Sequence, residues 1–151
     1  VSFGNSTILD HINLSIPTGE ATAIIGPAAS GKSVLFKYIL DLLDGEETKL
    51  EFFNILKEKV EPQPGEIGVM FQENALFDSM TARENISFQI VNTLSYSELK
   101  ALGVANKLLN EMGLSATTGN KYPSELSGGM QKRVALARAL SSKPKLLMLN
   151  I

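Results

Sequence analysis

Residues 26–33, reading GPAASGKS, decide how this chain is interpreted. They fit the pattern G-x-x-x-x-G-K-S/T, a loop whose backbone N–H groups surround phosphate oxygens. The short apolar run over 21–25 predicts a buried strand that leads into the loop. A helix is predicted over 32–43 because apolar residues recur there at helical spacing. They are Leu35, Ile39, Leu42 and Leu43. Strand, loop and helix in this order form the context that the motif requires.

The chemistry of the loop predicts a site for a nucleoside triphosphate. Backbone N–H groups and the dipole of the following helix favour bound phosphate, and Gly26 and Gly31 permit turns that a Cβ would obstruct. We expect Lys32 to bridge the β- and γ-phosphates and the Ser33 hydroxyl to ligate Mg²⁺. A glycine turn with an incidental lysine is less favoured, because the flanking elements fit the motif. The nucleotide-binding residues expected here are Gly26, Pro27, Ala28, Ala29, Ser30, Gly31, Lys32, Ser33 and Val34.

The composition is typical of one globular domain with a hydrophobic core. The chain has 151 residues, of which 44% are apolar and 20% are charged. A net charge of −2 does not indicate a nucleic-acid partner. The absence of cysteine excludes a disulfide scaffold and a cysteine-based metal site. No apolar run approaches the roughly 20 residues that span a bilayer, so a role at a membrane would require docking onto a partner.

Other segments give local predictions. Strands are predicted over 12–16, 68–71 and 145–149 from alternating or short apolar runs. Residues 50–56 could form a strand or a short helix. Helices are predicted to begin with capping boxes at Thr81 and Ser95, and Gly113 is predicted to end the second of these helices. Both chain ends lie in strand-like sequence, so we expect an incomplete domain of poor solubility.

A second glycine-bearing segment follows about a hundred residues after the loop. Ser127, Gly128 and Gly129 place a hydroxyl and backbone N–H groups where a helix over 130–140 is predicted to start, which is a further anion site. By itself Ser-Gly-Gly is a common turn. In its context, PSELSGGMQKRVALARAL over 123–140, it resembles the signature segment of ATP-binding cassette (ABC) ATPases.

This resemblance covers almost the whole chain and implies a fold and a set of partners. The implied class is α/β, a P-loop NTPase core with an α-helical subdomain, truncated after the Walker B strand. The core would comprise 1–72 and 141–151, and the helical subdomain with the signature helix about 73–140. The resemblance implies ATP and Mg²⁺ as cofactors, a head-to-tail homodimer that sandwiches two nucleotides, and transmembrane permease subunits. The implied location is cytoplasmic, peripheral on the inner face of the cell membrane.

The resemblance also assigns single residues. Gln72 matches the glutamine that senses Mg²⁺ and the attacking water, and Phe3 matches the aromatic that stacks on adenine. Without the other motifs, Gln72 would be interpreted as a solvated loop residue. Phe3, a lone aromatic residue near a chain end, fits a core position equally well. Residues 73–88, reading ENALFDSMTARENISF, match the surface that meets the membrane subunit. With residues 125–130 they look most like the ATPases of Mla/Mce-type lipid transporters, although amino-acid importers have similar segments.

Five positions depart from the family pattern or need a separate interpretation. Ala29 stands where glycine is common, and costs on the order of 1 kcal/mol if the position needs positive φ. Met130 replaces a glutamine, which we expect to be tolerated. Asn150 and Ile151 occupy the positions of the Walker B aspartate and the catalytic glutamate, so no intact catalytic residue is expected and ATP turnover should be essentially absent. His11, the single histidine, is expected to be structural or exposed.

Three function classes follow. The first is the ATPase subunit of an ABC transporter, which drives the transport of lipids or related substrates. The second is a non-hydrolysing relic or nucleotide-binding module, which Asn150 favours. The third is a soluble ABC ATPase of DNA repair or translation, which usually has long inserts or two cassettes. A P-loop kinase would leave residues 126–130 without a role.

Overall fold

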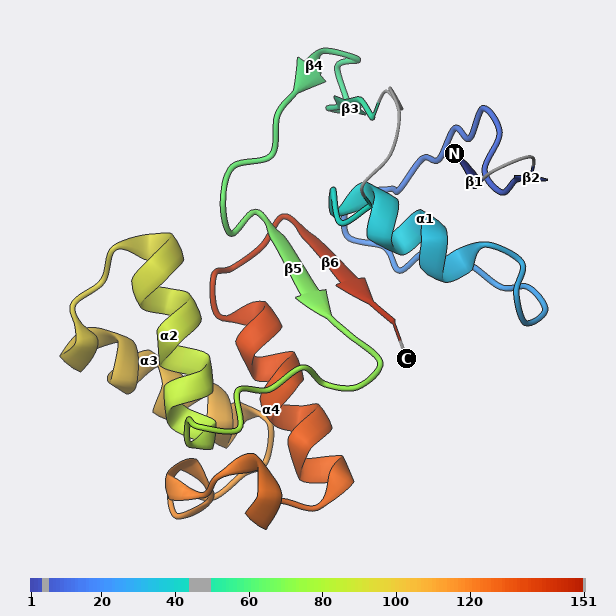
Figure 1. Cartoon of the computed structure of the whole chain (residues 1–151). Helices are drawn as coiled ribbons and strands as arrows, with labels where there is room; N and C mark the ends of the chain where they lie inside the picture. The colour runs from blue at the N-terminus through green and yellow to red at the C-terminus, as the bar shows by residue number, and fades with distance from the viewer. Residues whose placement is uncertain (4–5, 44–49, 151) are drawn as a thin grey trace. The chain divides into compact units, whose positions relative to one another are not determined.

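The computed structural model describes residues 1–3, 6–43 and 50–150. The chain divides into two compact units, Val1–Val60 and Glu61–Ile151 (Figure 1), and each is described by itself.

The first unit contains one helix and two small antiparallel pairs. Strands β1 (Ser2–Phe3) and β2 (Ser6–Thr7) pair with each other, and so do β3 (Phe52–Phe53) and β4 (Lys59–Val60). Helix α1 spans Lys32–Ile39. The turn between β3 and β4 forms because the Asn54 side-chain oxygen accepts the N–H groups of Leu56 and Glu58, at 2.9 and 3.0 Å. Residues 50–56 are therefore a short strand and a turn.

Two strand predictions in this unit are wrong. Residues 12–16 and 21–25 form no strand within the described part of the unit, and Ile24 and Ile25 are 50% and 91% exposed there. An apolar run indicates a tendency to burial, but a strand also needs a neighbouring backbone with which to exchange hydrogen bonds. Helix α1 also ends earlier than predicted, because Leu40 leaves the helical conformation and Asp41 has φ +54°.

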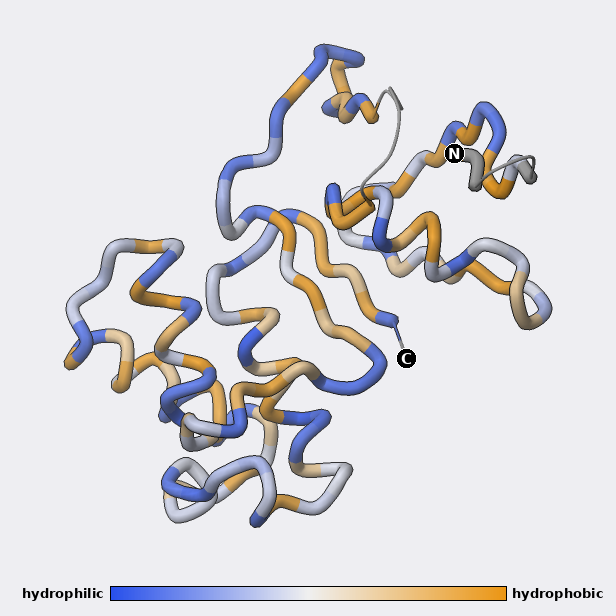
Figure 2. The backbone as a smooth tube through the Cα atoms, viewed as in Figure 1, coloured by the Kyte–Doolittle hydropathy of each residue, from blue (hydrophilic) through white to orange (hydrophobic). Residues whose placement is uncertain are grey.

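The second unit combines three helices with a two-stranded parallel sheet (Figure 1). The helices are α2 (Ala82–Leu94), α3 (Glu98–Glu111) and α4 (Gly128–Leu140), with short 3₁₀ turns η1 (Thr118–Asn120) and η2 (Pro123–Glu125). Strand β5 (Ile67–Met70) pairs in parallel with β6 (Leu146–Leu149). Both strands were predicted, to within a residue or two at their ends. Their apolar character is visible along both traces in Figure 2.

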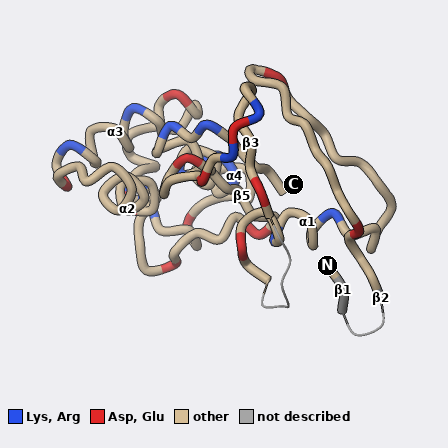
Figure 3. Tube along the Cα trace, turned by 90° about the horizontal axis from the view of Figure 1, so that it is seen from above, with Lys and Arg blue, Asp and Glu red and all other residues tan. Residues whose placement is uncertain are grey.

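The core of the second unit lies between its three helices. Its largest fully buried side chains are Ile86 and Ile90 of α2, Leu109 of α3, and Val134 of α4, together with Asn85. Buried alanines on all three helices keep the helix contacts short. The outer surface of α3 carries both signs of charge (Figure 3), including Lys107 and Glu111 at 3.8 Å, so its apolar side faces inward.

One of the two predicted capping boxes is confirmed. The Thr81 hydroxyl accepts the N–H of Glu84 at 3.3 Å, and the Glu84 carboxylate accepts the N–H of Thr81 at 2.8 Å. The Thr81 N–H and the Thr81 hydroxyl both donate to the Glu84 carboxylate, at 2.8 Å each, and these two bonds lower the pKa of Glu84. The box at Ser95 is wrong, because Ser95 has φ +52° and terminates α2, so α3 begins after Ser97. Gly113 has φ +68° and directly follows Met112, the C-cap of α3. It therefore lies at the end of this helix, as the sequence predicted.

Gly68 decides how β5 meets α4. A Cβ built on Gly68 would collide with the carbonyl oxygen of Ala139 and lie 2.7 Å from Cγ of Pro144. Since one obstacle is backbone and the other a proline ring, neither can move aside cheaply. The glycine is therefore required for the close contact between sheet and helix.

We predict that Gly68→Ala lowers the free energy of unfolding of the full-length protein by about 1–3 kcal/mol, because the added methyl overpacks this contact. Urea unfolding followed by circular dichroism measures the change. The matched control is Gly103→Ala in α3, where a Cβ meets no heavy atom of the described residues within 4 Å. This control should gain up to about 1 kcal/mol from helix propensity. Equal effects of the two substitutions would contradict the role assigned to Gly68.

Candidate functional site

The last two residues of GPAASGKS, Lys32 and Ser33, are the first two residues of a helix, as the motif requires. Helix α1 begins at Lys32, and its N-cap, Gly31, has φ +90°. Since this N-cap is a glycine, the described structure has no side-chain cap hydrogen bond at this helix end. Such a helix start attracts an anion through the N–H groups of its first turn and the helix dipole.

The Lys32 ammonium group lies folded over this loop. Its Nζ donates hydrogen bonds to the carbonyl oxygens of Gly26 and Pro27, at 2.8 and 2.7 Å, and to the Ser30 hydroxyl at 3.3 Å. An ammonium has three donors, so the loop itself supplies an acceptor for each. The bond to Ser30 is the longest and the one that a charged phosphate oxygen would most easily replace.

The conformations of two small residues set the shape of the loop. A Cβ on Gly31 would have a strained φ and would approach Cγ2 of Ile8 to 3.2 Å. Ala29 has φ +60°, so the position does require the left-handed conformation that favours glycine. This confirms the condition under which Ala29 is expected to strain the loop, at a cost on the order of 1 kcal/mol.

A cavity of about 320 Å³ adjoins the loop within the first unit. On one side are loop residues, among them Gly26, Ser30 and Lys32. The remaining lining is apolar and consists of Leu9, Ile12, Ile24, Ile25 and Leu35. Among the other expected loop residues, Pro27, Ala28 and Ser33 are exposed and Val34 is half-buried. The donors, the glycines and the open loop therefore fit a phosphate group, with Ser33 on the first turn of α1 as the candidate for Mg²⁺.

The signature segment forms the start of α4. The Ser127 hydroxyl accepts the N–H of Met130 at 3.3 Å, so the helix begins at Gly128, two residues earlier than predicted. Ser127, Gly128 and Gly129 are all exposed. A Cβ on either glycine would meet no heavy atom of the described residues within 4 Å. Packing inside the described chain therefore does not require glycine at these two positions.

Two side chains of α4 that the sequence did not single out hold the signature segment in place. Gln131 donates from Nε2 to the carbonyl oxygens of Pro123 and Leu126, at 2.8 and 3.4 Å. Arg133 donates to the carbonyl oxygens of Met112 and Gly113 at the end of α3. Polar residues on a helix facing loop carbonyls leave no distinctive pattern, so only the tertiary structure identifies them.

Gln72 and Asn150 lie at the same edge of the parallel sheet. Gln72 follows the end of β5 and is exposed, and Asn150 follows the end of β6 and is half-buried. The Asn150 N–H donates to the carbonyl oxygen of Met70 at 2.9 Å, which continues the pairing of the two strands. Carboxyl edges of parallel strands are where ligands bind in open α/β sheets.

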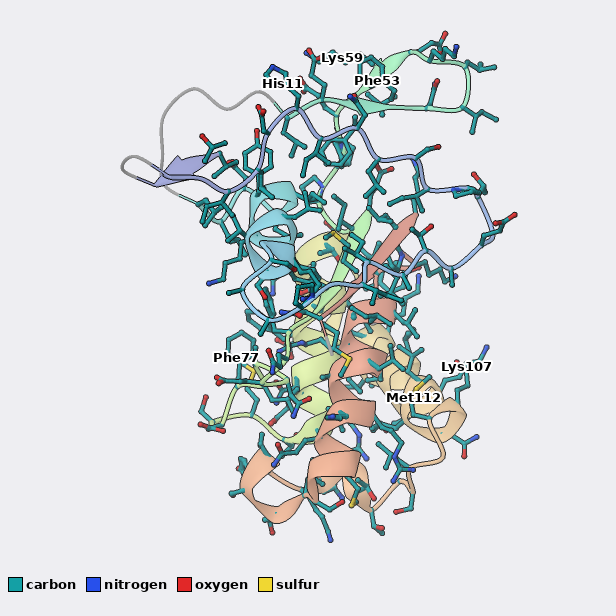
Figure 4. All side chains as sticks on the ribbon, turned by 90° about the vertical axis from the view of Figure 1, so that its right-hand side faces the viewer. His11, Phe53, Lys59, Phe77, Lys107 and Met112 are labelled. Atoms are coloured by element: carbon teal, nitrogen blue, oxygen red, sulfur yellow. The ribbon has the colours of Figure 1, made fainter. Side chains whose placement is uncertain are left out.

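The remaining predicted residues have these positions. Phe3 belongs to β1, but its side chain lies outside the described part of the structure, as does Ile151. His11 is exposed at the surface (Figure 4) and contacts the Asp10 carboxylate at 2.5 Å. Within the described residues no cluster of three or more His, Cys, Asp or Glu could hold a metal ion. A Mg²⁺ ion bound together with a nucleotide would therefore need other ligands, such as a hydroxyl, an amide and phosphate oxygens.

Comparison with known proteins identifies the family. Residues 9–150, which include the loop, the signature segment and both strands of the parallel sheet, match the family described as ABC transporter. The chain belongs to the ABC transporter family. Its fold is the P-loop NTPase fold of ABC ATPases, as expected. A solved structure of the ATP-binding cassette MJ0796, dimeric and bound to ADP and Pi, superposes with a TM-score of 0.80 at 29% identity. The match covers 99% of this chain and 68% of that one.

Similar proteins are named as ATP-binding proteins of import or transport. The sulfate/thiosulfate import ATP-binding protein CysA of Mesostigma viride is 39% identical over 98% of this ABC chain. The glutamine transport ATP-binding protein GlnQ of Escherichia coli is 38% identical, again over 98%. The chain spans 42% of the CysA protein and 63% of GlnQ. These relatives give no support to a lipid substrate. No helix in the described part of the chain has the length and hydropathy needed to span a bilayer.

We predict that Ala29→Gly raises the free energy of unfolding of the full-length protein by up to about 1 kcal/mol, because it relieves the positive φ. Affinity for a fluorescent ATP analogue should rise or stay unchanged. The control is Ala28→Gly at the adjacent exposed position, where φ is not positive. Glycine there should lower stability by up to about 1 kcal/mol. A loss of stability in Ala29→Gly equal to that of the control would contradict strain at Ala29.

Proposed function

We propose that this chain is the nucleotide-binding part of an ABC transporter ATPase, which binds ATP with Mg²⁺ and couples its binding and hydrolysis to transport. The observation that supports this most strongly is the Lys32 ammonium, folded over a glycine loop at an uncapped helix start. We assign the phosphates to residues 26–34 and Mg²⁺ to Ser33 and Gln72. Phe3 is the proposed contact for adenine. The proposed core is 1–72 with 141–151, and the proposed helical subdomain is 73–140.

The signature segment supports a head-to-tail dimer of two such chains. Gly128 and Gly129 are exposed at a helix start, and intrachain packing leaves open space where their Cβ atoms would lie. Glycine in a helix costs up to about 1 kcal/mol relative to alanine, so a reason outside the chain is needed. Close approach of a phosphate bound by a second copy supplies that reason. MJ0796, the structural relative, is dimeric.

Residues 73–88 are the proposed contact with transmembrane permease subunits. The proposed location is therefore cytoplasmic, peripheral on the inner face of the cell membrane. Two substrate classes have support of different kinds. The sequence of this segment favours a lipid, whereas the relatives are named for import of sulfate, thiosulfate or glutamine and so favour a small polar solute.

We predict that Lys32→Ala in the full-length protein weakens ATP binding by about tenfold or more, because a charge-assisted hydrogen bond to phosphate contributes roughly 1.5–3 kcal/mol. Titration with a fluorescent ATP analogue measures the affinity. The control is Lys37→Ala, an exposed lysine in the last turn of α1, whose affinity should stay within about twofold. Unchanged affinity in Lys32→Ala, with the fold intact by circular dichroism, would refute the nucleotide site.

The alternative is a nucleotide-binding module that does not hydrolyse ATP, and Asn150 favours it. An amide in place of a carboxylate carries no charge with which to hold Mg²⁺ through water. We predict that Asn150→Asp in the full-length protein raises steady-state ATP turnover by about 10- to 100-fold, the usual effect of an outer-shell metal contact. Phosphate release measures turnover, with the Lys32→Ala variant as the background. If wild-type turnover lies clearly above the Lys32→Ala background and equals that of Asn150→Asp, Asn150 does not limit hydrolysis and the alternative fails.

A further inference from the structure

The turn that follows Gln72 is held in a strained conformation. Asn74 has φ +61° and Ala75 has φ +47°, two consecutive non-glycine residues in the left-handed region. Such a conformation persists only where the surroundings fix it. In Figure 4, Phe77 lies on this same segment, which leads into α2.

Arg138, near the end of α4, fixes this turn from one side. Its Nη1 donates to the carbonyl oxygen of Ala75 at 2.7 Å, and its Nη2 donates to that of Asn74 at 3.1 Å. The guanidinium carbon lies 5.8 Å from the centre of the Phe77 ring. The side chain is half-buried, and burial lowers the pKa of its guanidinium group. Hydrogen bonds from a partly desolvated charge are stronger than those at an open surface.

Asn85 of α2 fixes the other side of the segment. Its fully buried side chain accepts the N–H of Phe77 at 2.8 Å and donates to the Phe77 carbonyl oxygen at 3.1 Å. The Phe77 ring also packs edge-on against Phe88 of α2, with ring centres 5.3 Å apart. The segment 74–77 therefore has one set of bonds to α2 and one to α4.

The bonds of Arg138 connect two places that the proposed function uses. Helix α4 starts at the Ser127 cap, and Arg138 lies about 16 Å further along the helix axis at 1.5 Å per residue. A helix of this length transmits a displacement of one end to the other. The fork of the guanidinium, which donates to two successive carbonyls, then passes that displacement to the turn.

We propose that Arg138 is a positioning residue that couples the signature end of α4 to the turn at 74–77, so that nucleotide binding at the signature changes the conformation of that turn. The inference rests on the proposed function, since it requires nucleotide at the signature. It goes beyond that function because it names the residue that carries the response. A residue with a solely structural role would fix the turn equally with and without nucleotide.

Hydrogen exchange of the full-length protein, read by mass spectrometry with and without Mg²⁺ and a non-hydrolysable ATP analogue, tests the coupling. In the wild type we expect the exchange rate of the peptide over 73–80 to change at least threefold with nucleotide. In Arg138→Met this response should be lost, while ATP affinity stays within twofold. Arg138→Lys keeps the charge but loses the fork, and should restore less than half of the response. The matched control is Arg83→Met in α2, whose side chain donates to the Asn106 side chain and to the carbonyl oxygen of Ala116, and it should keep the full response.

The outcomes separate the coupling from the proposed function. A nucleotide response that persists in Arg138→Met, or that is absent in a wild type which binds the analogue, overturns the coupling. If Arg138→Met does not fold, Arg138→Lys decides, and a full response in that variant overturns the role of the fork. If the wild type does not bind the analogue in a Lys32-dependent way, the proposed function has failed. In that case faster exchange over 73–80 in Arg138→Met would still show that Arg138 fixes the turn.

Discussion

The close contact between β5 and α4 at Gly68 is the constraint on which the second unit depends. The carbonyl oxygen of Ala139 occupies the space that a Cβ would need, so helix and sheet meet through backbone atoms. This contact sets the position of α4, and α4 carries the signature glycines at one end and Arg138 at the other. Helices α2 and α3 complete the core against the alanine-rich side of α4. The absence of a Cβ at Gly68 thus fixes where α4, and with it the signature segment and Arg138, lies against the sheet.

The two glycine-bearing helix starts differ in how many of their N–H donors are already satisfied. Helix α1 has a glycine at its N-cap and no side-chain cap within the described structure, and the lysine that follows it turns back over the loop. Helix α4 has a serine cap that already satisfies one N–H. The first arrangement leaves more donors for a ligand, as a primary phosphate site needs. The second leaves a pre-ordered helix end with exposed glycines, as a surface that closes on a ligand held elsewhere needs.

The sequence predicted correctly those helix starts that depend on residues only a few positions apart. The capping box at Thr81 depends on residues three apart, and α1 follows directly from the glycine loop, so both were found from the sequence. The box at Ser95 failed because the same four residues also had to end α2, and a left-handed Ser95 ended it. The strands predicted over 12–16 and 21–25 failed because pairing depends on a second strand, which an apolar run does not specify. Gln131, Arg133 and Arg138 were not predicted, since their partners are carbonyl groups without any sequence signal.

The sequence by itself determined the family, and it predicted a phosphate-binding loop with Lys32 and a signature segment, because each depends on residue types at fixed short spacing. It also indicated that Ala29 would be strained if its backbone were left-handed. Only the tertiary structure decided that this backbone is left-handed, that Gly68 is required by the backbone of α4, and that Arg138 binds a turn 63 residues away. Those features arise from contacts between distant segments, and such contacts exist only after the helices and strands have packed.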